Sequence, residues 1–417
     1  MNRYVQQIQS LAEEVIPGAT QTYSKGHQYF PKNYPKFIIE GNGCTVMDHE
    51  GRKYTDFICG LGAITLGYRY PAVDEAIVEQ LTKGISFSLP NTLEYKAAEL
   101  LIDLFPYHRM VRFLKTGSGA TTAAVKVARA YTKRDIIIKC VPGYHGWHDW
   151  YSCHTDKDLG IPAGVKDLTL EFKYNDIASL EKILKEKVNE VACVIMEPMV
   201  NIYPHFGFLN KVRDLCHEHG TLLIFDETLT GFRWHVSGAQ HYFGVAPDIT
   251  VLGKGMANGM PLSAVLGSST VMDQIDGGCF VSTTFGGETL SLAAAIATIN
   301  TMKILSTQRY CFHLGKILQQ ELGTPHHIYG HPSRPILRLE RDDDNICSTY
   351  LTMKLAEAGY LVHPGLLINI CYSHQQSDIL GLAKAIRTIT NKMNITELGN
   401  MMDAIDGKPW KAAFKRY

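Results

Sequence analysis

Three short apolar runs in the stretch from Val191 to Val265 constrain the fold of this chain more than any other feature. They are VACVIM at Val191–Met196, LLIF at Leu222–Phe225 and ITVL at Ile249–Leu252. Continuous apolar runs of about four to eight residues are typical of strands that are buried on both faces of a sheet. A charged residue follows each run, namely Glu197, Asp226 and Lys254. Because open α/β sheets bind ligands at the carboxyl ends of their strands, the pattern predicts an α/β fold with a site at these residues.

Lys254 and Asp226 indicate a cofactor that has an aldehyde and a pyridine ring. Lys254 stands between Gly253 and Gly255 in an apolar neighbourhood, and burial makes an ammonium group lose its proton more easily. An unprotonated lysine forms a Schiff base with an aldehyde, and an aspartate beside a pyridine nitrogen keeps that ring protonated. Together they point to pyridoxal 5'-phosphate (PLP). Simpler roles stay open, namely a solvated turn for Lys254, a helix cap for Asp226 and a turn or helix-start carboxylate for Glu197.

The turn Lys115–Gly119, KTGSG, is a candidate anion site. It lies between a predicted strand at Val111–Leu114 and a predicted helix at Ala120–Arg134. The first N–H groups of a helix are unpaired and its dipole is positive there. A dinucleotide fingerprint is disfavoured, because Thr122 replaces the third glycine and the next strand carries Lys139 instead of an acidic residue. Two interpretations of this segment remain, namely a simple tight turn and a site that binds the phosphate of PLP.

The loop after the predicted strand Ile136–Cys140 is rich in aromatic rings. It reads Pro-Gly-Tyr-His-Gly-Trp, and the rings of Tyr144, His145, Trp147 and Trp150 are close together in sequence. Aromatic clusters belong to a hydrophobic core more often than to a cofactor site. This cluster follows a strand in a Gly/Pro-rich loop, which favours a ligand-facing role.

The other predicted elements alternate along the chain as expected for an α/β protein. A hairpin is expected from Phe37–Asp48 and Gly51–Phe57, a loop over Tyr151–Lys173, and a strand over Pro332–Glu340. Helical spacing predicts helices at Pro71–Lys83, Thr92–Leu104, Ile177–Lys187, Phe208–His219, Leu292–Ile304, Ser348–Gly359 and Asp378–Met393.

The ordered motifs FDE, TGFR, APDI and LGKG resemble those of the class III PLP-dependent aminotransferases. The resemblance extends from Ile16 to about the final helix. It implies a fold type I α/β architecture, in which a mostly parallel large-domain sheet carries helices on both faces beside a smaller α+β domain. The expected division is an N-terminal segment at 1–58 that packs on the small domain, a large PLP-binding domain at 59–305 and a small domain at 306–417.

The resemblance also assigns roles to individual residues. Lys254 would hold PLP as a Schiff base, and Asp226 would keep the pyridine ring protonated. Tyr144 would stack on the cofactor ring, Thr228 would pack on its other face, and His145 and Glu197 would be nearby polar contacts. The phosphate would lie on Thr116, Gly117, Ser118 and, from the neighbouring subunit of a homodimer, Thr284. Gly119 departs from the pattern, since the family commonly has an acidic residue there, and Thr284 on its own reads as a helix cap.

The substrate is expected from two departures within the subgroup that resembles glutamate-1-semialdehyde aminomutase. Lys25 stands where that enzyme uses an arginine for the substrate carboxylate, and lysine lacks the planar fork that grips a carboxylate with two bonds. The usual Thr-Leu-Ser-Gly-Asn-Pro is replaced by TFGGET at Thr284–Thr289. These departures look like those of enzymes that aminate oxidised sugars and aminoglycoside precursors. Glu288 adds a carboxylate that would attract a cationic aminosugar, or would serve as a helix N-terminal acid.

The expected activity is therefore amino transfer in two halves, from glutamate or glutamine to a carbonyl acceptor. Two alternatives remain. One is a 2,1-aminomutase of the glutamate-1-semialdehyde type, which moves the amino group within one molecule. The other is a catalytically silent PLP-fold protein that acts as a regulator or scaffold.

Composition excludes several other classes of protein. Lys and Arg total 41 and so do Asp and Glu, so no global field favours nucleic acid or an anionic membrane. No apolar run approaches the roughly 20 residues of a membrane span, and Met1–Gly18 does not resemble a signal peptide. None of the ten cysteines forms a CxxC pair, so no structural zinc or other metal is expected. A cytoplasmic protein with reduced thiols is expected.

Overall fold

The computed structural model describes residues 3–31, 33–323, 327–393, 396–406 and 408–411. The chain divides into two compact units. Unit 1 combines the described residues up to Tyr70 with those from Arg309 onward, and unit 2 runs from Pro71 to Gln308. These limits differ by some residues from the domain boundaries expected at 58/59 and 305/306, which stay predictions.

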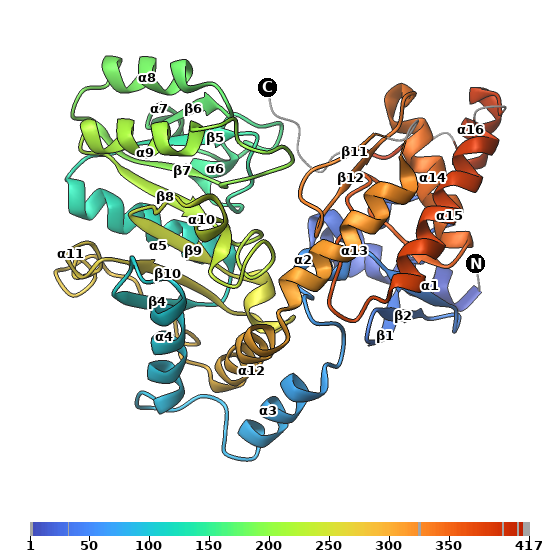
Figure 1. The fold of residues 1–417 in the computed structure, drawn as a ribbon, viewed down its shortest axis with the longest axis horizontal. Helices are drawn as coiled ribbons and strands as arrows, with labels where there is room; N and C mark the ends of the chain where they lie inside the picture. Colours follow the sequence, from blue (N-terminus) through green and yellow to red (C-terminus); the bar gives the residue numbers. More distant parts are fainter. Residues whose placement is uncertain (1–2, 32, 324–326, 394–395, 407, 412–417) are drawn as a thin grey trace. The chain divides into compact units, whose positions relative to one another are not determined.

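A seven-stranded sheet forms the centre of unit 2 (Figure 1). Its strand order is β4-β10-β9-β8-β7-β5-β6. The strands are β4 (Met110–Leu114), β5 (Ile136–Val141), β6 (Thr169–Lys173), β7 (Val191–Met196), β8 (Leu222–Asp226), β9 (Ile249–Leu252) and β10 (Ser263–Gly267). Only β10 runs against its neighbours β4 and β9, and the other pairs are parallel. The predicted α/β fold with a mostly parallel sheet is confirmed.

Both faces of this sheet are covered by helices, because its strands are apolar on both sides. Side chains at alternate strand positions point to opposite faces. Ile137 and Ile224 therefore pack with α5 (Gly117–Thr132), whereas Ile138 and Leu223 pack with α8 (Ile177–Glu186) and α9 (Phe208–Glu218). Figure 1 shows α8 and α9 on one side of the sheet and α5 on the other. Each fully buried Ile or Leu contributes about 1.5–3 kcal/mol to the stability of these layers.

The remaining helices of unit 2 lie before, between and after these strands in the chain. They are α3 (Pro71–Leu81), α4 (Thr92–Leu104), α6 (Asp149–Ser152), α7 (Ala163–Asp167), α10 (Gly238–Phe243), α11 (Ser269–Met272) and α12 (Thr289–Leu305). Within the described residues no single helix is long and apolar enough to cross a membrane, and only the bent pair formed by α12 and α13 (Thr307–Leu322) meets the length and composition of a span.

Unit 1 contains a four-stranded sheet in the order β1-β2-β3-β13. The strands are β1 (Ile38–Asn42), β2 (Thr45–Asp48), β3 (Lys53–Asp56) and β13 (Tyr360–Leu361). The parallel pairing of β3 with β13 joins the N-terminal segment to the C-terminal third. The expected hairpin turn after Asp48 is present between β2 and β3. A second turn between β1 and β2 was not expected, although the Asn42-Gly43 dipeptide is a strong hairpin signal.

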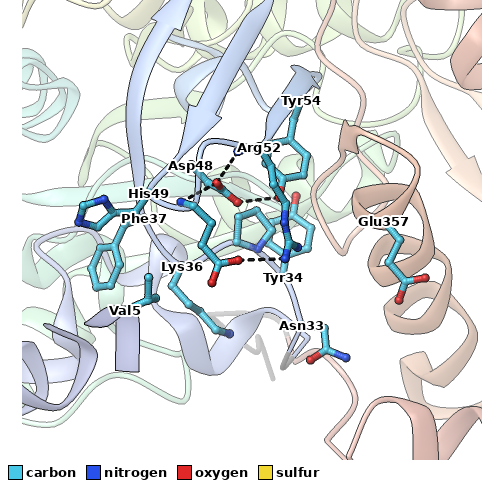
Figure 2. A pocket seen from close by; sticks show the side chains of 12 residues that line it. Val5, Asn33, Tyr34, Lys36, Phe37, Asp48, His49, Arg52, Tyr54 and Glu357 are labelled. Atoms are coloured by element: carbon cyan, nitrogen blue, oxygen red, sulfur yellow. Dashed lines mark hydrogen bonds and ion pairs between the residues drawn. The ribbon is translucent and has the colours of Figure 1, made fainter. Parts of the chain in front are cut away.

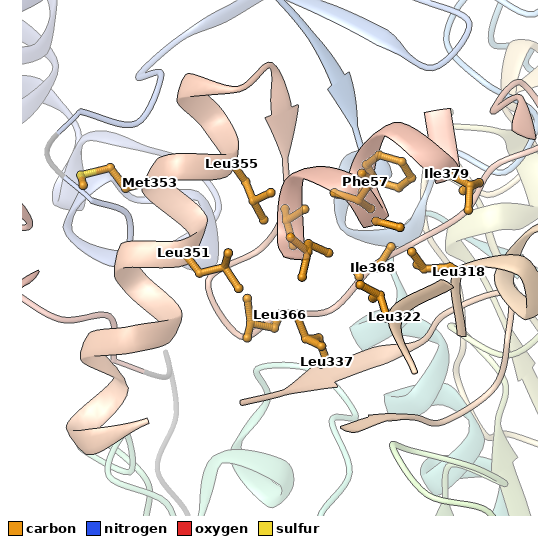
Figure 3. Packing of buried hydrophobic residues seen from close by; sticks show 14 of the residues in the cluster. Phe57, Leu318, Leu322, Leu337, Leu351, Met353, Leu355, Leu366, Ile368 and Ile379 are labelled. Atoms are coloured by element: carbon orange, nitrogen blue, oxygen red, sulfur yellow. The ribbon is translucent and has the colours of Figure 1, made fainter. Parts of the chain in front are cut away.

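The hydrophobic core of unit 1 is built mainly from C-terminal helices. Figure 3 shows Leu351 and Leu355 of α14 (Ile346–Glu357) in the same cluster as Ile379 of α15 (Gln376–Met393) and Phe57 from the N-terminal segment. The other helices and strands of unit 1 are α1 (Arg3–Val15), α2 (Cys59–Gly62), α16 (Leu398–Ala404), β11 (His327–Tyr329) and β12 (Ile336–Arg338).

Several elements were missed or misjudged from the sequence. The predicted loop Tyr151–Lys173 contains α7 and the edge strand β6, whose alternating TLEFK pattern is short and half polar. The predicted strand Pro332–Glu340 is reduced to β12, because Pro332–Pro335 makes a turn before it. Helix α13 was not predicted, although its buried residues Cys311, Leu314, Leu318 and Leu322 follow helical spacing.

Candidate functional site

Most predicted site residues follow the carboxyl ends of strands in the unit 2 sheet. Asp226 ends β8, and Lys254 follows β9, which pairs with β8 in parallel. Glu197 follows β7, the neighbour of β8 on the other side. Tyr144 follows β5, and the turn at Thr116 follows β4, which runs in the same direction as β9. Parallel topology therefore brings these side chains to one edge of the sheet, where α/β proteins bind ligands.

The most constrained contact at this edge joins Asp226 to His145. Nδ1 of His145 and Oδ2 of Asp226 are 2.8 Å apart, and both side chains are buried. The backbone N–H of Thr228 donates to the other oxygen, Oδ1, at 3.0 Å. Burial alone would raise the pKa of Asp226, but the hydrogen bond and charge of His145 and the contact with Thr228 hold that pKa below its ordinary value. The carboxylate of Asp226 is therefore kept ionised inside the protein.

Glu197 is also buried near Asp226, but its pKa is shifted in the opposite direction. Its Oε1 accepts the backbone N–H of Tyr144 at 2.8 Å. Burial and the negative charge of Asp226 raise the pKa of Glu197, although His145, the Tyr144 N–H and the charge of Lys254 oppose the shift. Neighbouring carboxyl groups whose pKa values are pushed apart divide the charge unequally. Of the two carboxyl groups, Asp226 is therefore the one whose charged form these surroundings favour.

The N-terminus of α5 offers an anion site next to these groups. Oγ1 of Thr116 accepts the N–H of Gly119 at 3.0 Å, which is an N-cap, and the carbonyl of Thr116 accepts from Oγ of Ser263. The other N–H groups of a first helical turn have no partner within the helix. A Cβ on Gly117 would lie 3.1 Å from the methyl group of Thr228. Glycine at this position thus keeps open a cradle at the helix end, and the cradle fits the phosphate group of PLP.

The aromatic loop lies against α5. Oγ1 of Thr121 donates to the carbonyl of His145 at 2.6 Å. Gly146 has φ of +121°, and a Cβ there would come within 2.5 Å of Oγ of Ser118, so this close approach requires glycine. The predicted cluster divides in two, since Tyr144 and Trp147 are exposed by 47% and 75% whereas His145 and Trp150 are buried. The two exposed rings are the ones available to a ligand.

Lys254 opens a single turn of 3-10 helix, Lys254–Ala257, directly after Gly253. Its φ of +40° is a left-handed conformation that side-chain-bearing residues rarely adopt, and such strain gathers at functional sites. The side chain is partly buried. Its charge acts on the carboxyl group of Glu197, which places the lysine among the residues of this edge.

Among the described residues, no contact joins Thr284 to the other predicted site residues. It lies in an exposed turn ahead of α12. Glu288, in contrast, is the N-cap of α12, where its oxygens accept the N–H groups of Leu290 and Ser291. Oε2 of Glu288 also pairs with Nζ of Lys115 at 2.8 Å. The suggestion that Glu288 attracts a cationic aminosugar is therefore wrong for this arrangement, because its carboxylate is already committed to the helix and to Lys115.

Glu227, the last residue of the FDE motif, has a role that the sequence did not reveal. It is fully buried and accepts hydrogen bonds from the backbone N–H of Gln240 at 2.8 Å and from Oγ1 of Thr230 at 3.0 Å. The N–H of Ala239 also donates to it. Glu227 thus fixes the segment after Asp226 onto the start of α10.

Unit 1 has a separate cavity of about 290 Å³ (Figure 2). None of the predicted site residues lines it. Its charged groups are largely engaged, since Arg52 pairs with Glu50 at 3.0 Å and Asp48 accepts the hydroxyl of Tyr54 at 2.7 Å. Burial lowers the pKa of Lys36 in its wall to about 8. Lys25, the residue that replaces the expected arginine, also belongs to unit 1, in the short 3-10 helix Tyr23–Lys25.

One group of cysteine and histidine side chains in unit 1 has a spacing that would suit a metal. The ligand atoms of Cys59, Cys371 and His374 lie within 4.8 Å of one another, and all three residues are buried. However, Nδ1 of His374 already accepts the backbone N–H of Cys371 at 3.0 Å. The ring of His374 also stacks on Phe57 at 4.3 Å. These contacts give the imidazole a packing role.

Residues 29–334 match the family described as Aminotransferase class-III. The chain is 34% identical over 394 residues to 3-aminobutyryl-CoA aminotransferase from Cloacimonas acidaminovorans (strain Evry), which covers 90% of this chain and 94% of that protein. It is 36% identical over 307 residues to glutamate-1-semialdehyde 2,1-aminomutase from Desulforamulus reducens, covering 70% of this chain and 71% of the relative.

Solved structures agree with the fold. The PLP internal aldimine form of the FumI protein from Sphingopyxis sp. MTA144 superposes with a TM-score of 0.88 at 25% identity, covering 95% of this chain and 99% of that one. A transaminase with PLP bound has a TM-score of 0.85 at 24% identity, and 98% and 99% of the two chains are covered. Sequence, fold and a buried, ionised carboxylate beside an anion cradle agree, and the chain belongs to the class-III aminotransferases, enzymes that use PLP as their cofactor.

Proposed function

We propose that this enzyme moves an amino group from glutamate or glutamine to the carbonyl carbon of an oxidised sugar or aminoglycoside precursor. The observation that carries the amino-transfer chemistry is the buried contact of Asp226 with His145, at 2.8 Å. Bound PLP supplies an aldehyde that condenses with amines and a pyridine ring that accepts an electron pair. A carboxylate that stays ionised next to that ring holds a proton on the pyridine nitrogen.

Each remaining residue of the edge has a proposed task. The amine of Lys254 would anchor the cofactor and, when free, would act as the base that moves a proton at Cα of the amino substrate. Tyr144 covers one face of the ring and Thr228 the other, and His145 and Glu197 supply polar contacts beside Asp226. The phosphate is held by the α5 N-terminus through Thr116, Gly117 and Ser118.

We propose further that the active form is a homodimer in which Thr284 completes the phosphate site of the partner subunit. Thr284 is exposed, and the exposed side chain of Phe285 follows it. The segment that carries the exposed Phe87 and Leu89 is tied to the start of α12, because Ile85 O accepts the N–H of Thr289 at 3.0 Å. An exposed apolar surface around a polar site residue is typical of a subunit interface.

The acceptor proposal rests on Lys25 and its neighbours. An aminomutase of the glutamate-1-semialdehyde type would be expected to have an arginine at Lys25 for the substrate carboxylate. The segment Thr20–Phe30 offers hydroxyls, amides and rings, which suit a polyol more than a short acid. A pocket that bonds hydroxyls rejects analogues without them by up to about 10⁴-fold.

A thioester substrate is the second candidate. The relative named 3-aminobutyryl-CoA aminotransferase aligns with 90% of this chain, whereas the aminomutase relative aligns with 70%. This broader alignment favours transfer to or from a β-amino acyl thioester over amino migration within glutamate-1-semialdehyde.

A direct comparison of acceptors distinguishes these functions. The purified, PLP-loaded protein is given glutamate with a 6-aldehydo or keto sugar, or glutamate with 3-oxobutyryl-CoA, at matched concentrations, and 2-oxoglutarate or amino product is measured. In a third arm it is given glutamate-1-semialdehyde alone, without a donor. Sugar amination supports the main proposal. Conversion of the thioester with inert sugars would replace it with the second candidate, and conversion of the semialdehyde without a donor would establish the aminomutase. Improved use of small carboxylates by Lys25→Arg would support the role given to Lys25.

We also propose a cytoplasmic location. All ten cysteines are free and nine of them are buried, and free thiols persist in reducing compartments. Fractionation of producing cells tests this, and recovery from an exported fraction would contradict it.

A further inference from the structure

Lys139 is a buried lysine of the large sheet, on the strand next to the edge strand β6. It lies on β5 and is 2% exposed. Its register partner on β6 is Glu171, and Nζ of Lys139 is 3.1 Å from Oε1 of that residue. A buried ammonium group is costly unless its charge is paired and its hydrogens are bonded. The other hydrogen-bond partners of Lys139 therefore indicate its role.

Two of those contacts are backbone carbonyls beyond the aromatic loop. Nζ donates to the carbonyl of Tyr151 at 2.7 Å and to that of Cys153 at 2.8 Å. These carbonyls lie at the end of the short helix α6, where helical carbonyls lack partners within the helix. With Glu171 they provide three acceptors for the three N–H donors of an ammonium group. Nζ also lies 5.3 Å from the centre of the Tyr151 ring.

Tyr151 in turn contacts the part of the loop that carries the proposed cofactor residues. Its hydroxyl donates to the carbonyl of Gly143 at 2.9 Å. Its ring packs edge-on against Tyr144 with a centroid separation of 5.2 Å, and against His145 at 5.8 Å. A continuous path of contacts thus runs from Lys139 through Tyr151 to Tyr144 and to the imidazole that is bonded to Asp226.

We propose that Lys139 is a positioning residue for amino transfer. It acts through Tyr151 to set the ring of Tyr144 and the imidazole of His145. This inference rests on the proposed function, because it takes Tyr144 as the ring that covers the cofactor and Asp226 as its pyridine partner. Lys139 does not touch the reacting atoms. It orients the groups that do, and small errors in such orientation are costly to rate.

The test compares four variants as PLP-loaded full-length protein, namely Lys139→Met, Tyr151→Phe, the double variant of these two, and a control. Lys139→Met keeps the length of the side chain and removes the charge with its three contacts. Tyr151→Phe keeps the ring and removes only the hydroxyl that reaches Gly143. Lys173→Met is the matched control, because Lys173 is an exposed lysine on β6, the strand next to β5. Measurements are the circular dichroism of the bound cofactor in the visible region, kcat and KM for the amino donor, and borohydride labelling.

Lys139→Met is expected to keep a borohydride-labelled Lys254, to lose much of the visible circular dichroism, and to lower kcat about 10- to 100-fold with little change in KM. Tyr151→Phe should change the same signals less, and the double variant should be no worse than Lys139→Met, since both act through one path. Lys173→Met should match the wild type.

If Lys139 has only a structural role, different results are expected for Lys139→Met. Lys139→Met would then unfold at a lower temperature while its visible dichroism and kcat per folded site stayed at wild-type values, and this result would overturn the inference. If Lys139→Met does not fold, Tyr151→Phe decides, and wild-type dichroism and kcat in that variant would also overturn it. Absence of label on Lys254 in the wild type would instead defeat the proposed function, so the two failures are distinguishable.

Discussion

Asp226 and Glu197 are buried carboxyl groups at the ends of neighbouring strands, yet their pKa values are shifted in opposite directions. His145 stabilises the charge of Asp226, and its pKa is held below the ordinary value. Burial and the nearby charge of Asp226 raise the pKa of Glu197, which accepts one backbone N–H, from Tyr144. Of the two, Asp226 is therefore the group suited to hold a proton on a pyridine nitrogen at neutral pH.

Asp226→Asn should retain bound PLP but lose about 10²- to 10³-fold in kcat. The amide keeps the size of the side chain and loses the charge that balances a protonated pyridine. Cofactor absorbance and steady-state rates measure the two effects separately. Asp273→Asn is the control, since Asp273 is exposed on the same unit. Wild-type rates in Asp226→Asn would reduce Asp226 to a structural cap.

Among the helices and strands, the sequence predicts the strands that are continuous apolar runs and misses the strand that is half polar. The runs at Val191–Met196 and Ile249–Leu252 are apolar at every position, so their strands were predicted with nearly the bounds observed. Strand β6 lies at the sheet edge and contains polar residues, so its sequence pattern resembles that of a loop. The contact of His145 with Asp226 spans 81 residues, so no local pattern reveals it. Motif order predicts the site residues, and only the parallel topology shows which of them lie at one edge of the sheet.

The N-terminus of α12 allows a prediction about pH. Partial burial would raise the pKa of Glu288, but Lys115, Ser291 and the N–H of Leu290 outweigh it and hold that pKa below 4.5. A carboxyl group with a depressed pKa stabilises the fold above its unfolded pKa and loses that contribution as the pH falls through the folded value. Glu288→Gln should therefore be less stable by about 1 kcal/mol at pH 7.

Thermal unfolding at a series of pH values measures this difference. The gap between wild type and Glu288→Gln should be constant from about pH 8 to pH 5 and should shrink below pH 4.5, as the carboxyl group becomes protonated. Glu79→Gln is the control, because Glu79 forms an exposed pair with Lys83 that is expected to contribute little. A gap that persists undiminished at pH 4 would argue against this role of the ionised Glu288.

At the scale of the whole molecule, the shared-site proposal predicts complementation. Lys254→Ala lacks the cofactor anchor, and a Thr284→Ala variant should bind PLP poorly at the partner's site. A heterodimer of the two has one site with both residues intact if Thr284 acts across the interface, and none if it acts within its own subunit. Random pairing of equal amounts should therefore restore about a quarter of the wild-type activity.

Co-expression of the two variants with different tags, followed by isolation of the doubly tagged protein, measures this directly. The isolated heterodimer should reach about half of the wild-type activity, because one of its two sites is intact. Each variant alone is the control and should be nearly inactive. Activity no higher than the sum of the separate variants, in a preparation shown to contain heterodimers, would place Thr284 outside the partner's site.

Borohydride reduction followed by peptide mapping tests whether Lys254 anchors PLP at the carboxyl edge of the unit 2 sheet. Reduction makes the bond between lysine and cofactor permanent, so the modified peptide identifies the residue. The expected result is a pyridoxyl group on the peptide that contains Lys254, and its loss together with turnover in Lys254→Ala. A pyridoxyl group on any other lysine, with Lys254 unmodified in active enzyme, would contradict the account.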